Sequence, residues 1–233
     1  MAGFFITGTD TGVGKTRIAA ALIHAFRKKG QRVVGMKPVA SGCRQTADGL
    51  RNDDAERLQA ASSINLDYAE INPYAFAPAI SPHLAAREAN RPIELQKIVD
   101  QYQALATQSD LVVVEGVGGW RVPLGQVITT EHLAKALELP VVMVVGLRLG
   151  CINHALLTAQ AVEVSGLQCC GWVGNQIDPG MERSYDVVAT LAQRLSAPLL
   201  GMVPFDIETS DEGLASHLAI DVLHKKHKQG RGD

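Results

Sequence analysis

The sequence predicts an α/β fold in which a mostly parallel sheet is covered by helices on both faces. Two observations support this class. Apolar runs rich in β-branched residues alternate with stretches of helical pattern along the whole chain. In addition, the runs Val112–Val114 and Val141–Val145 are apolar without alternation, which is typical of strands buried on both faces. No internal repeat or low-complexity linker divides the 233 residues, so we expect a single domain.

The order of the elements follows from where the apolar runs and helical patterns fall. The expected strands are Phe4–Thr7, Arg32–Met36, Leu111–Val114, Val141–Val145, Gln168–Val173 and Leu199–Val203. The expected helices are Lys15–Lys29, Asp53–Ala61, Ile93–Gln108, Glu131–Glu138, Asn153–Ser165 and Met181–Leu195. Residues 62–92 contain four prolines and predict a long connection with short helical pieces over the sheet. The basic tail after about residue 222 is expected to fray.

Composition limits the classes of function. The chain has 22 Lys and Arg against 24 Asp and Glu, and this near-neutral balance gives no reason to expect a nucleic-acid partner. The spacing of Cys43, Cys151, Cys169 and Cys170 fits neither a zinc site nor a secreted disulfide framework. The first apolar run is too short for a signal peptide, and no run is long enough to span a membrane. We therefore expect a cytoplasmic protein with reduced thiols.

The first strand leads into a glycine-rich loop that ends in Gly14-Lys15-Thr16 and is followed at once by a helical pattern. This is the context of a phosphate-binding loop, because glycines let backbone N–H groups surround phosphate oxygens and the helix N-terminus adds positive charge. Lys15 can reach the outer phosphates and Thr16 can bind Mg²⁺. The first glycine is Gly8 and not Thr9, so the loop is one residue longer than usual. We predict a P-loop NTPase; an ordinary turn with a surface lysine is the alternative.

Polar residues directly after strands are the next candidates, because ligands of open parallel sheets bind outside the carboxyl ends of the strands. Glu115 follows a strand and suits a Mg²⁺ ligand, or else is a solvated carboxylate. Lys37 could stabilise charge during phosphoryl transfer, or lie on the surface. Local sequence alone favours a helix N-cap role for Asp54. The start of a helix at Gly150–Asn153 could hold an anion or have no ligand.

Together these motifs resemble the ATP-dependent dethiobiotin synthetase family. The resemblance extends from the N-terminus to about Asp211 and is specific because several motifs occur jointly and in order. They are Thr7–Thr16, Lys37–Gly42, Leu50–Asp54, Glu115–Trp120, Leu149–His154 and Gly171–Asn175. The resemblance implies an ATP-dependent cyclo-ligase of biotin biosynthesis that is a homodimer. It would form a carbamate from 7,8-diaminononanoate and CO₂, transfer the ATP γ-phosphate to it, and close the ring to give dethiobiotin, ADP and phosphate.

The resemblance also implies residue roles. Lys37, Lys15 and Thr11 would be catalytic, and Thr16, Asp54 and Glu115 would bind Mg²⁺, a role that replaces the N-cap interpretation of Asp54. ATP would be bound by Gly12, Val13, Gly14, Lys15, Thr16, Arg17, Asp54, Glu115, Gly116, Val117, Gly118, Asn175, Gln176, Pro204, Phe205 and Asp206. The diamine would be bound by Thr11, Lys37, Ser41, Gly118, Gly150, Cys151 and Asn153. The last three would come from the partner subunit.

Other classes of function remain as alternatives. A switch ATPase of the partition or division-site type shares this kind of sheet and loop, but its loop usually begins with an extra lysine, which Thr7-Gly8-Thr9 lacks. The stretch Leu218–Lys228 could serve such a protein as a basic membrane helix, although its apolar face is short. The ATP-using domain of a corrin amidotransferase and a small-molecule kinase are further alternatives. Some dethiobiotin synthetases carry Glu where this chain has Gly12, so no acidic side chain acts there.

Overall fold

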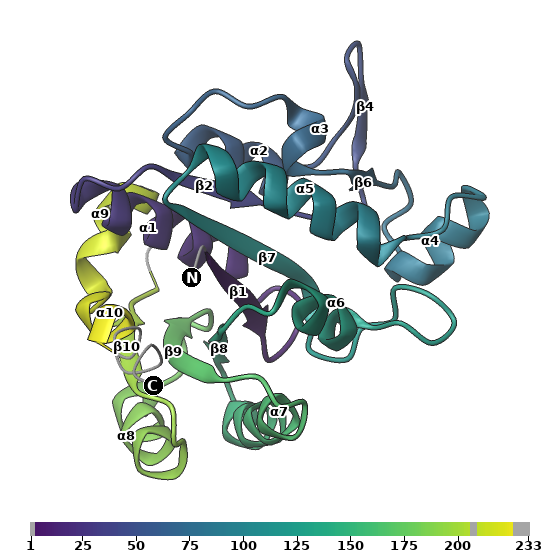
Figure 1. The fold of residues 1–233 in the computed structure, drawn as a ribbon. Helices are drawn as coiled ribbons and strands as arrows, with labels where there is room; N and C mark the ends of the chain where they lie inside the picture. The colour runs from purple at the N-terminus through teal and green to yellow at the C-terminus, as the bar shows by residue number, and fades with distance from the viewer. Residues whose placement is uncertain (1–2, 206–208, 226–233) are drawn as a thin grey trace, which may run out of the picture.

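A six-stranded parallel sheet forms the centre of the molecule (Figure 1). The computed structural model describes residues 3–205 and 209–225. The strand order is β10-β9-β8-β1-β7-β2, and every neighbouring pair is parallel. The strands are β1 (Gly3–Gly8), β2 (Val33–Met36), β7 (Leu111–Gly119), β8 (Val141–Leu147), β9 (Cys169–Gln176) and β10 (Leu199–Val203). All six strands correspond to predicted runs, which confirms the α/β fold class.

Helices cover both faces of the sheet, as predicted. On one face lie α1 (Lys15–Lys28), α9 (Asp211–Leu214), a short 3-10 turn (Ala215–His217) and α10 (Asp221–Lys225). On the other lie α5 (Leu95–Gln108), α6 (Thr130–Leu137), α7 (Cys151–Val164) and α8 (Ser184–Arg194). Alternate side chains of β1 enter opposite cores, since Phe4 and Ile6 pack with α1 whereas Phe5 packs with α5 and α6. Both cores are therefore built from the same strands.

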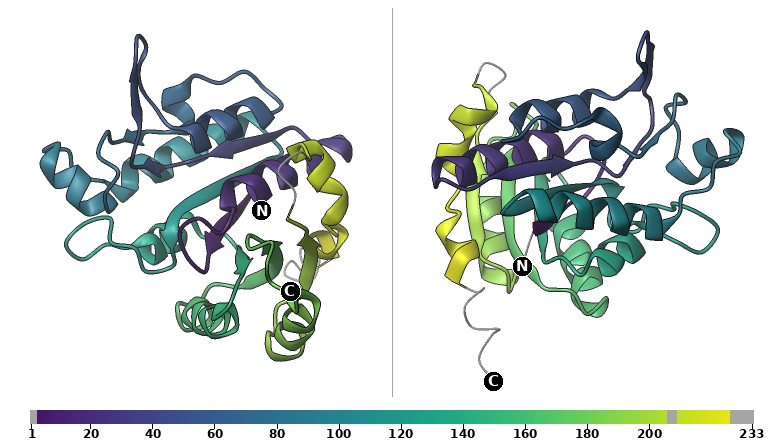
Figure 2. Two further views of the ribbon diagram at one scale, coloured as in Figure 1. Left: turned by 180° about the vertical axis from the view of Figure 1, so that it is seen from behind. Right: turned by 45° about the horizontal axis from the view of Figure 1, so that its top comes forward.

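Residues between β2 and α5 form a layer beyond the edge of the sheet (Figure 2). This layer contains α2 (Asp53–Ala61), α3 (Tyr68–Ile71) and α4 (Pro82–Glu88). It also contains two small sheets that the sequence analysis did not predict: β3 (Val39–Ala40) with β6 (Tyr74–Ala75), and the hairpin of β4 (Arg44–Thr46) and β5 (Gly49–Arg51). Strands of two or three residues are too short to show a hydrophobic period. The predicted short helical pieces in residues 62–92 are α3 and α4.

Four of the six helix starts differ from the prediction. Helix α5 begins at Leu95, two residues later than predicted, and α6 begins at Thr130, one residue earlier. Helix α7 begins at Cys151, two residues earlier than predicted, because Gly150 adopts a left-handed conformation (φ 89°) that turns the chain into the helix. Helix α8 begins at Ser184, three residues later than predicted.

Leu223 of α10 is buried, and the residues from 226 onward, where we expect fraying, lie outside the described residues. Within the described ranges no helix is long and apolar enough to cross a membrane.

The last described segment packs tightly against β10 at Gly201. A Cβ atom on Gly201 would lie 1.9 Å from the carbonyl oxygen of His217, a backbone atom that cannot easily move. We expect Gly201→Ala to lower the free energy of unfolding by about 1–3 kcal/mol, as overpacked sites do. Urea denaturation measures this. Gly180→Ala is the control, because its Cβ would meet only the Asp178 carboxylate at 3.3 Å, and it should change stability by less than about 0.5 kcal/mol. Equal effects of the two substitutions would contradict this packing.

Candidate active site

The loop between β1 and α1 has the conformation that phosphate binding needs. Gly12 and Gly14 have φ angles of 74° and 87°, in the left-handed region that favours glycine. Space also restricts Gly14, because a Cβ there would lie 2.2 Å from Nδ2 of Asn175. That Nδ2 donates a hydrogen bond of 2.9 Å to the carbonyl of Val13. The end of β9 therefore fixes the shape of the loop from the side.

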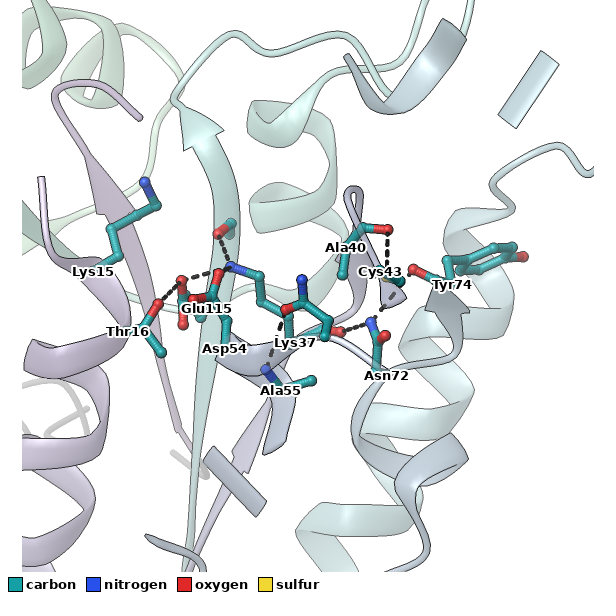
Figure 3. A network of polar contacts seen from close by, with 12 residues as sticks. Lys15, Thr16, Lys37, Ala40, Cys43, Asp54, Ala55, Asn72, Tyr74 and Glu115 are labelled. Carbon is teal, nitrogen blue, oxygen red and sulfur yellow. Dashed lines mark hydrogen bonds and ion pairs between the residues drawn. The ribbon is translucent and has the colours of Figure 1, made fainter. Parts of the chain in front are cut away.

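A compact polar cluster lies beside the start of α1 (Figure 3). The Lys37 Nζ donates to Glu115 Oε1 at 2.6 Å and to Asp54 Oδ2 at 2.9 Å. The Thr16 hydroxyl donates to the same Glu115 oxygen at 2.9 Å. Lys37 follows β2 and Glu115 lies in β7, and these strands are neighbours in the sheet, whereas Asp54 lies in the first turn of α2. The fold therefore brings together side chains from four separate segments.

Lys37 and Glu115 are both buried, with residue exposures of 3% and 1%. Burial is the largest influence on Glu115 and raises its pKa, although the Lys37 charge acts in the opposite direction. Burial also opposes the charged form of Lys37, but Glu115 and then Asp54 outweigh it and keep the Lys37 pKa above its ordinary value. Burial similarly opposes ionisation of Asp54, yet Lys37 keeps the pKa of that carboxyl low. Lys37 is thus held as a cation between two acidic side chains.

Lys15 is the second buried lysine of the site. Burial, and then repulsion from Lys37, lower the pKa of Lys15 to about 8. Its Nζ donates to the carbonyl oxygen of Asp10 at 3.0 Å. A phosphate group beside Lys15 would favour the charged form of the amine, so the loop is electrostatically suited to an anion.

A cavity of about 720 Å³ opens above these groups. The predicted site residues that line it are Thr11, Gly12, Gly14, Lys15, Thr16, Arg17, Lys37, Ser41, Asp54, Glu115, Val117 and Gly118. Two buried oxygens of this lining, Glu115 Oε2 and Ser41 Oγ, have no hydrogen-bond partner among the described residues. Buried polar atoms normally have partners, so both suit contacts with a ligand or ion.

Several predicted ATP-binding residues lie outside the cavity lining. Val13 is buried beneath the loop, Gly116 accepts from the Lys37 Nζ at 3.4 Å through its carbonyl, and Asn175 holds the loop as described. Gln176 ends β9 and is partly exposed. Pro204 and Phe205 are exposed after β10, and Asp206 lies outside the described residues.

The predicted diamine-binding residues at the start of α7 are also absent from this cavity. Cys151 is buried, and its N–H donates to the carbonyl of Arg148 at 3.1 Å. Asn153 is exposed, and no described residue accepts a hydrogen bond from its N–H or from that of Ile152. Arg148 forms an ion pair with Asp10 of the phosphate loop, which ties the two loops together.

The structure settles three local alternatives. Asn52 is the N-cap of α2, because its side chain accepts a hydrogen bond of 3.3 Å from the N–H of Ala55, so the N-cap interpretation of Asp54 is wrong. The surface interpretation of Lys37 and the solvated interpretation of Glu115 are also wrong, because both are buried.

Among the described residues no group of three or more His, Cys, Asp or Glu side chains could hold a metal ion. The smaller set of the Asp54 and Glu115 carboxylates with the Thr16 hydroxyl nevertheless suits Mg²⁺, because this ion keeps waters and phosphate oxygens as further ligands.

Sequence reasoning missed part of the cavity lining. Ile80 and Val122 contribute apolar side chains to the lining, and Arg57 contributes a cation. The available signal for Arg57 was its spacing, because it stands three residues after Asp54 and so lies on the same face of the predicted helix.

Comparisons with known proteins agree with this geometry. Residues 2–213 match a family model described as an AAA domain. A protein of Pseudomonas aeruginosa named "ATP-dependent dethiobiotin synthetase BioD" is 53% identical over 96% of this chain and 98% of its own length. A protein of the same name from Xanthomonas axonopodis is 52% identical over 91% of this chain and 96% of its own. Among solved structures, the MinC:MinD cell division protein complex of Aquifex aeolicus aligns with a TM-score of 0.60 at 17% identity, covering 100% of this chain and 98% of that chain. This last likeness concerns the fold alone.

The buried cluster allows a test of its electrostatics. Lys37→Met leaves Glu115 buried without its main cation, and we expect a loss of about 3–5 kcal/mol in unfolding free energy near pH 8. Without Lys37 the folded-state pKa of Glu115 rises further above its unfolded value. The folded protein then binds a proton more readily than the unfolded chain, and the loss should shrink as the pH falls toward about 5. Urea denaturation of variant and wild type at both pH values measures the difference.

The matched control removes both charges. Lys37→Met combined with Glu115→Gln leaves no uncompensated buried carboxylate and should recover most of the stability lost near pH 8. A loss that is independent of pH, or a double variant no more stable than Lys37→Met alone, would contradict the buried ion pair.

Proposed function

This chain belongs to the ATP-dependent dethiobiotin synthetase family, and we propose that it uses Mg-ATP to carboxylate 7,8-diaminononanoate and close its ring to dethiobiotin. The observation that carries the proposal is the identity of 52–53% with two proteins of that name over nearly their whole length. The cavity supports it, because phosphate-binding, metal-binding and cationic groups converge there. ADP and phosphate are the other products, and we place the reaction in the cytoplasm.

The phosphate loop would bind and orient the ATP phosphates. Its backbone N–H groups and the N-terminus of α1 attract anions, and Lys15 adds a charge that reaches into the cavity. Thr16, Asp54 and Glu115 would hold Mg²⁺, and the unpartnered Oε2 of Glu115 fits that role. When bound, Mg²⁺ neutralises charge on the phosphate oxygens. Lys37 already supplies a cation between the two carboxylates, so this set of ligands is arranged for positive charge.

Lys37 and Lys15 would stabilise the negative charge of the reacting groups. One amine of the substrate takes up CO₂ and loses a proton to become a carbamate. A carbamate oxygen then bonds to the γ-phosphorus of ATP as the bond to ADP breaks. The second amine attacks the carbamate carbon, loses a proton and expels phosphate, which closes the ring. Because these steps need little covalent help from the protein, positioning and charge stabilisation are its main contributions.

Other parts of the cavity lining would bind the diamine. Thr11, Ser41 and the backbone of Gly118 offer polar contacts, and Ile80 and Val122 suit an aliphatic chain. The unpartnered hydroxyl of Ser41 supports a contact with a ligand there. The substrate carboxylate would reach the first turn of α7 in a second copy of the chain, so we propose a homodimer with a shared active site.

The reaction itself is the first test. We expect phosphate release from Mg-ATP to require both 7,8-diaminononanoate and bicarbonate, and mass spectrometry to find a ureido product equal to the diamine plus CO₂ minus water. Omitting either substrate is the control. Phosphate release that is indifferent to both would overturn the proposal and favour a switch ATPase, and release with the diamine alone would favour a kinase.

Lys15 gives a second test. Lys15→Ala removes a charge that would strengthen its contact as the γ-phosphoryl group transfers, and we expect kcat to fall about 10²–10³-fold. Lys135→Ala, an exposed lysine of α6 outside the cavity, is the control and should leave kcat unchanged. Steady-state kinetics measure both variants. An unchanged kcat in Lys15→Ala, with only KM affected, would contradict a role in the transition state.

A further inference from the structure

Arg57 of α2 is held by an acidic residue from the far end of the chain. Its Nε lies 2.5 Å from Oδ2 of Asp211 and its Nη2 lies 2.6 Å from Oδ1, which is a bidentate ion pair. Asp211 begins α9, which packs beside α1 in Figures 1 and 2. The side chain of Asp211 is 13% exposed and that of Arg57 41%, so the acid is largely enclosed while the guanidinium reaches solvent.

The geometry leaves one edge of the guanidinium available. Asp211 occupies the Nε and Nη2 edge, and within the described parts of the chain Nη1 has no hydrogen-bond partner. A guanidinium has five donors in a rigid fork, so one edge can bind a carboxylate while the other binds a second anion. Arg57 also lines the 720 Å³ cavity together with Lys15, Thr16 and Asp54. Arg57 therefore shares one cavity with the groups through which the phosphate loop would attract anions.

Neighbouring charge agrees with this placement. Arg57 and Asp54 are one turn apart on α2, and the carboxylates of Asp54 and Glu115 both raise the pKa of Arg57, after the larger effect of Asp211. Arg17 of α1 binds the same part of the chain, since its Nη2 donates to the carbonyl of Thr209 at 3.2 Å. The segment around Asp211 thus joins the cavity wall through two arginines.

We propose that Arg57 binds a phosphate group of the nucleotide through its free Nη1 edge, and that Asp211 positions Arg57 for this contact. The proposal rests on the nucleotide site of the proposed function but not on the identity of the second substrate. Arg57 is a binding residue in this account, and Asp211 is a positioning residue that acts through it. Arginine suits this position better than lysine, because only the guanidinium can serve both anions at once.

Nucleotide binding to the full-length protein tests the proposal directly. We expect Arg57→Met to raise the Kd of a non-hydrolysable ATP analogue about tenfold in isothermal titration calorimetry, as loss of a charge-assisted contact would. Arg57→Lys should recover only part of the affinity. Arg44→Met is the matched control, because Arg44 pairs with Asp53 and Glu56 of the same helix but does not line the cavity. Its Kd should stay within twofold of wild type.

Two further measurements separate phosphate contact from general stability. Adenosine carries no phosphate, so its Kd should be the same for Arg57→Met and wild type. Asp211→Asn should raise the Kd of the ATP analogue about threefold in the wild-type background and have no added effect in Arg57→Met, because Asp211 acts through Arg57. A merely structural Asp211 would lower affinity equally in both backgrounds, which would overturn its positioning role.

The proposal fails if Arg57→Met binds the ATP analogue with wild-type affinity, or if it loses affinity for adenosine and the ATP analogue alike. Circular dichroism shows whether each variant is folded, and Arg57→Gln replaces Arg57→Met if that variant is not. These results do not depend on the diamine. If wild type shows no diamine-dependent phosphate release, the proposed reaction is overturned. If Arg57→Met still binds the ATP analogue more weakly than that wild type, the proposed Arg57 contact with phosphate stands.

Discussion

The pairing of Lys37 with Glu115 is the constraint on which the rest of the site depends. Removing two charges from water is costly, and apolar residues of the same size would often give a stability at least as high. We therefore attribute this buried pair to function. The ion pair depends on the register of β2 beside β7, which brings Lys37 next to Glu115. The side-chain amide of Asn72 also fixes the backbone of Lys37, because it donates a hydrogen bond of 2.6 Å to the Lys37 carbonyl. The layer outside the sheet thus supports the charge within it.

The topology explains why the phosphate loop meets this pair. Strand β1 lies between β7 and β8. The connection that follows β1 runs toward β2, whereas the connection that follows the neighbouring strand β8 runs the opposite way, toward β9. Such a switch point opens a crevice at the carboxyl ends of the strands. The loop after β1 enters that crevice, where Glu115 of β7 approaches from one side and Asn175, from β9 beyond β8, from the other. One topological feature therefore places both the Glu115 carboxylate and the residue that shapes the loop.

The sequence was sufficient for the main sheet, because its buried strands are uninterrupted apolar runs that need no tertiary information to recognise. Local sequence could not decide which residue of Asn52-Asp53-Asp54 caps α2, since all three are good caps and Lys37, distant in sequence, determines where Asp54 points. The spacing of Arg57 from Asp54 was a usable local signal, but local sequence could not show the ion pair of Arg57 with Asp211, which is 154 positions away. The positions of Lys37 and Glu115 directly after strands predicted that both lie at one edge of the sheet, whereas the functional role of Asp54 came from the resemblance to a known family.

Fold alone does not determine what this chain does. A phosphate loop beside a buried carboxylate and a cation suits many proteins that use ATP. The likeness to the MinC:MinD complex at 17% identity concerns the fold alone. In the proposed reaction, selectivity for the second substrate would depend on the rest of the cavity lining, which includes Ser41, Ile80 and Val122. Ser41 directly follows β3, and the pairing of β3 with β6 lies outside the main sheet. A strand pair with a weak sequence signal thus positions Ser41 at the cavity.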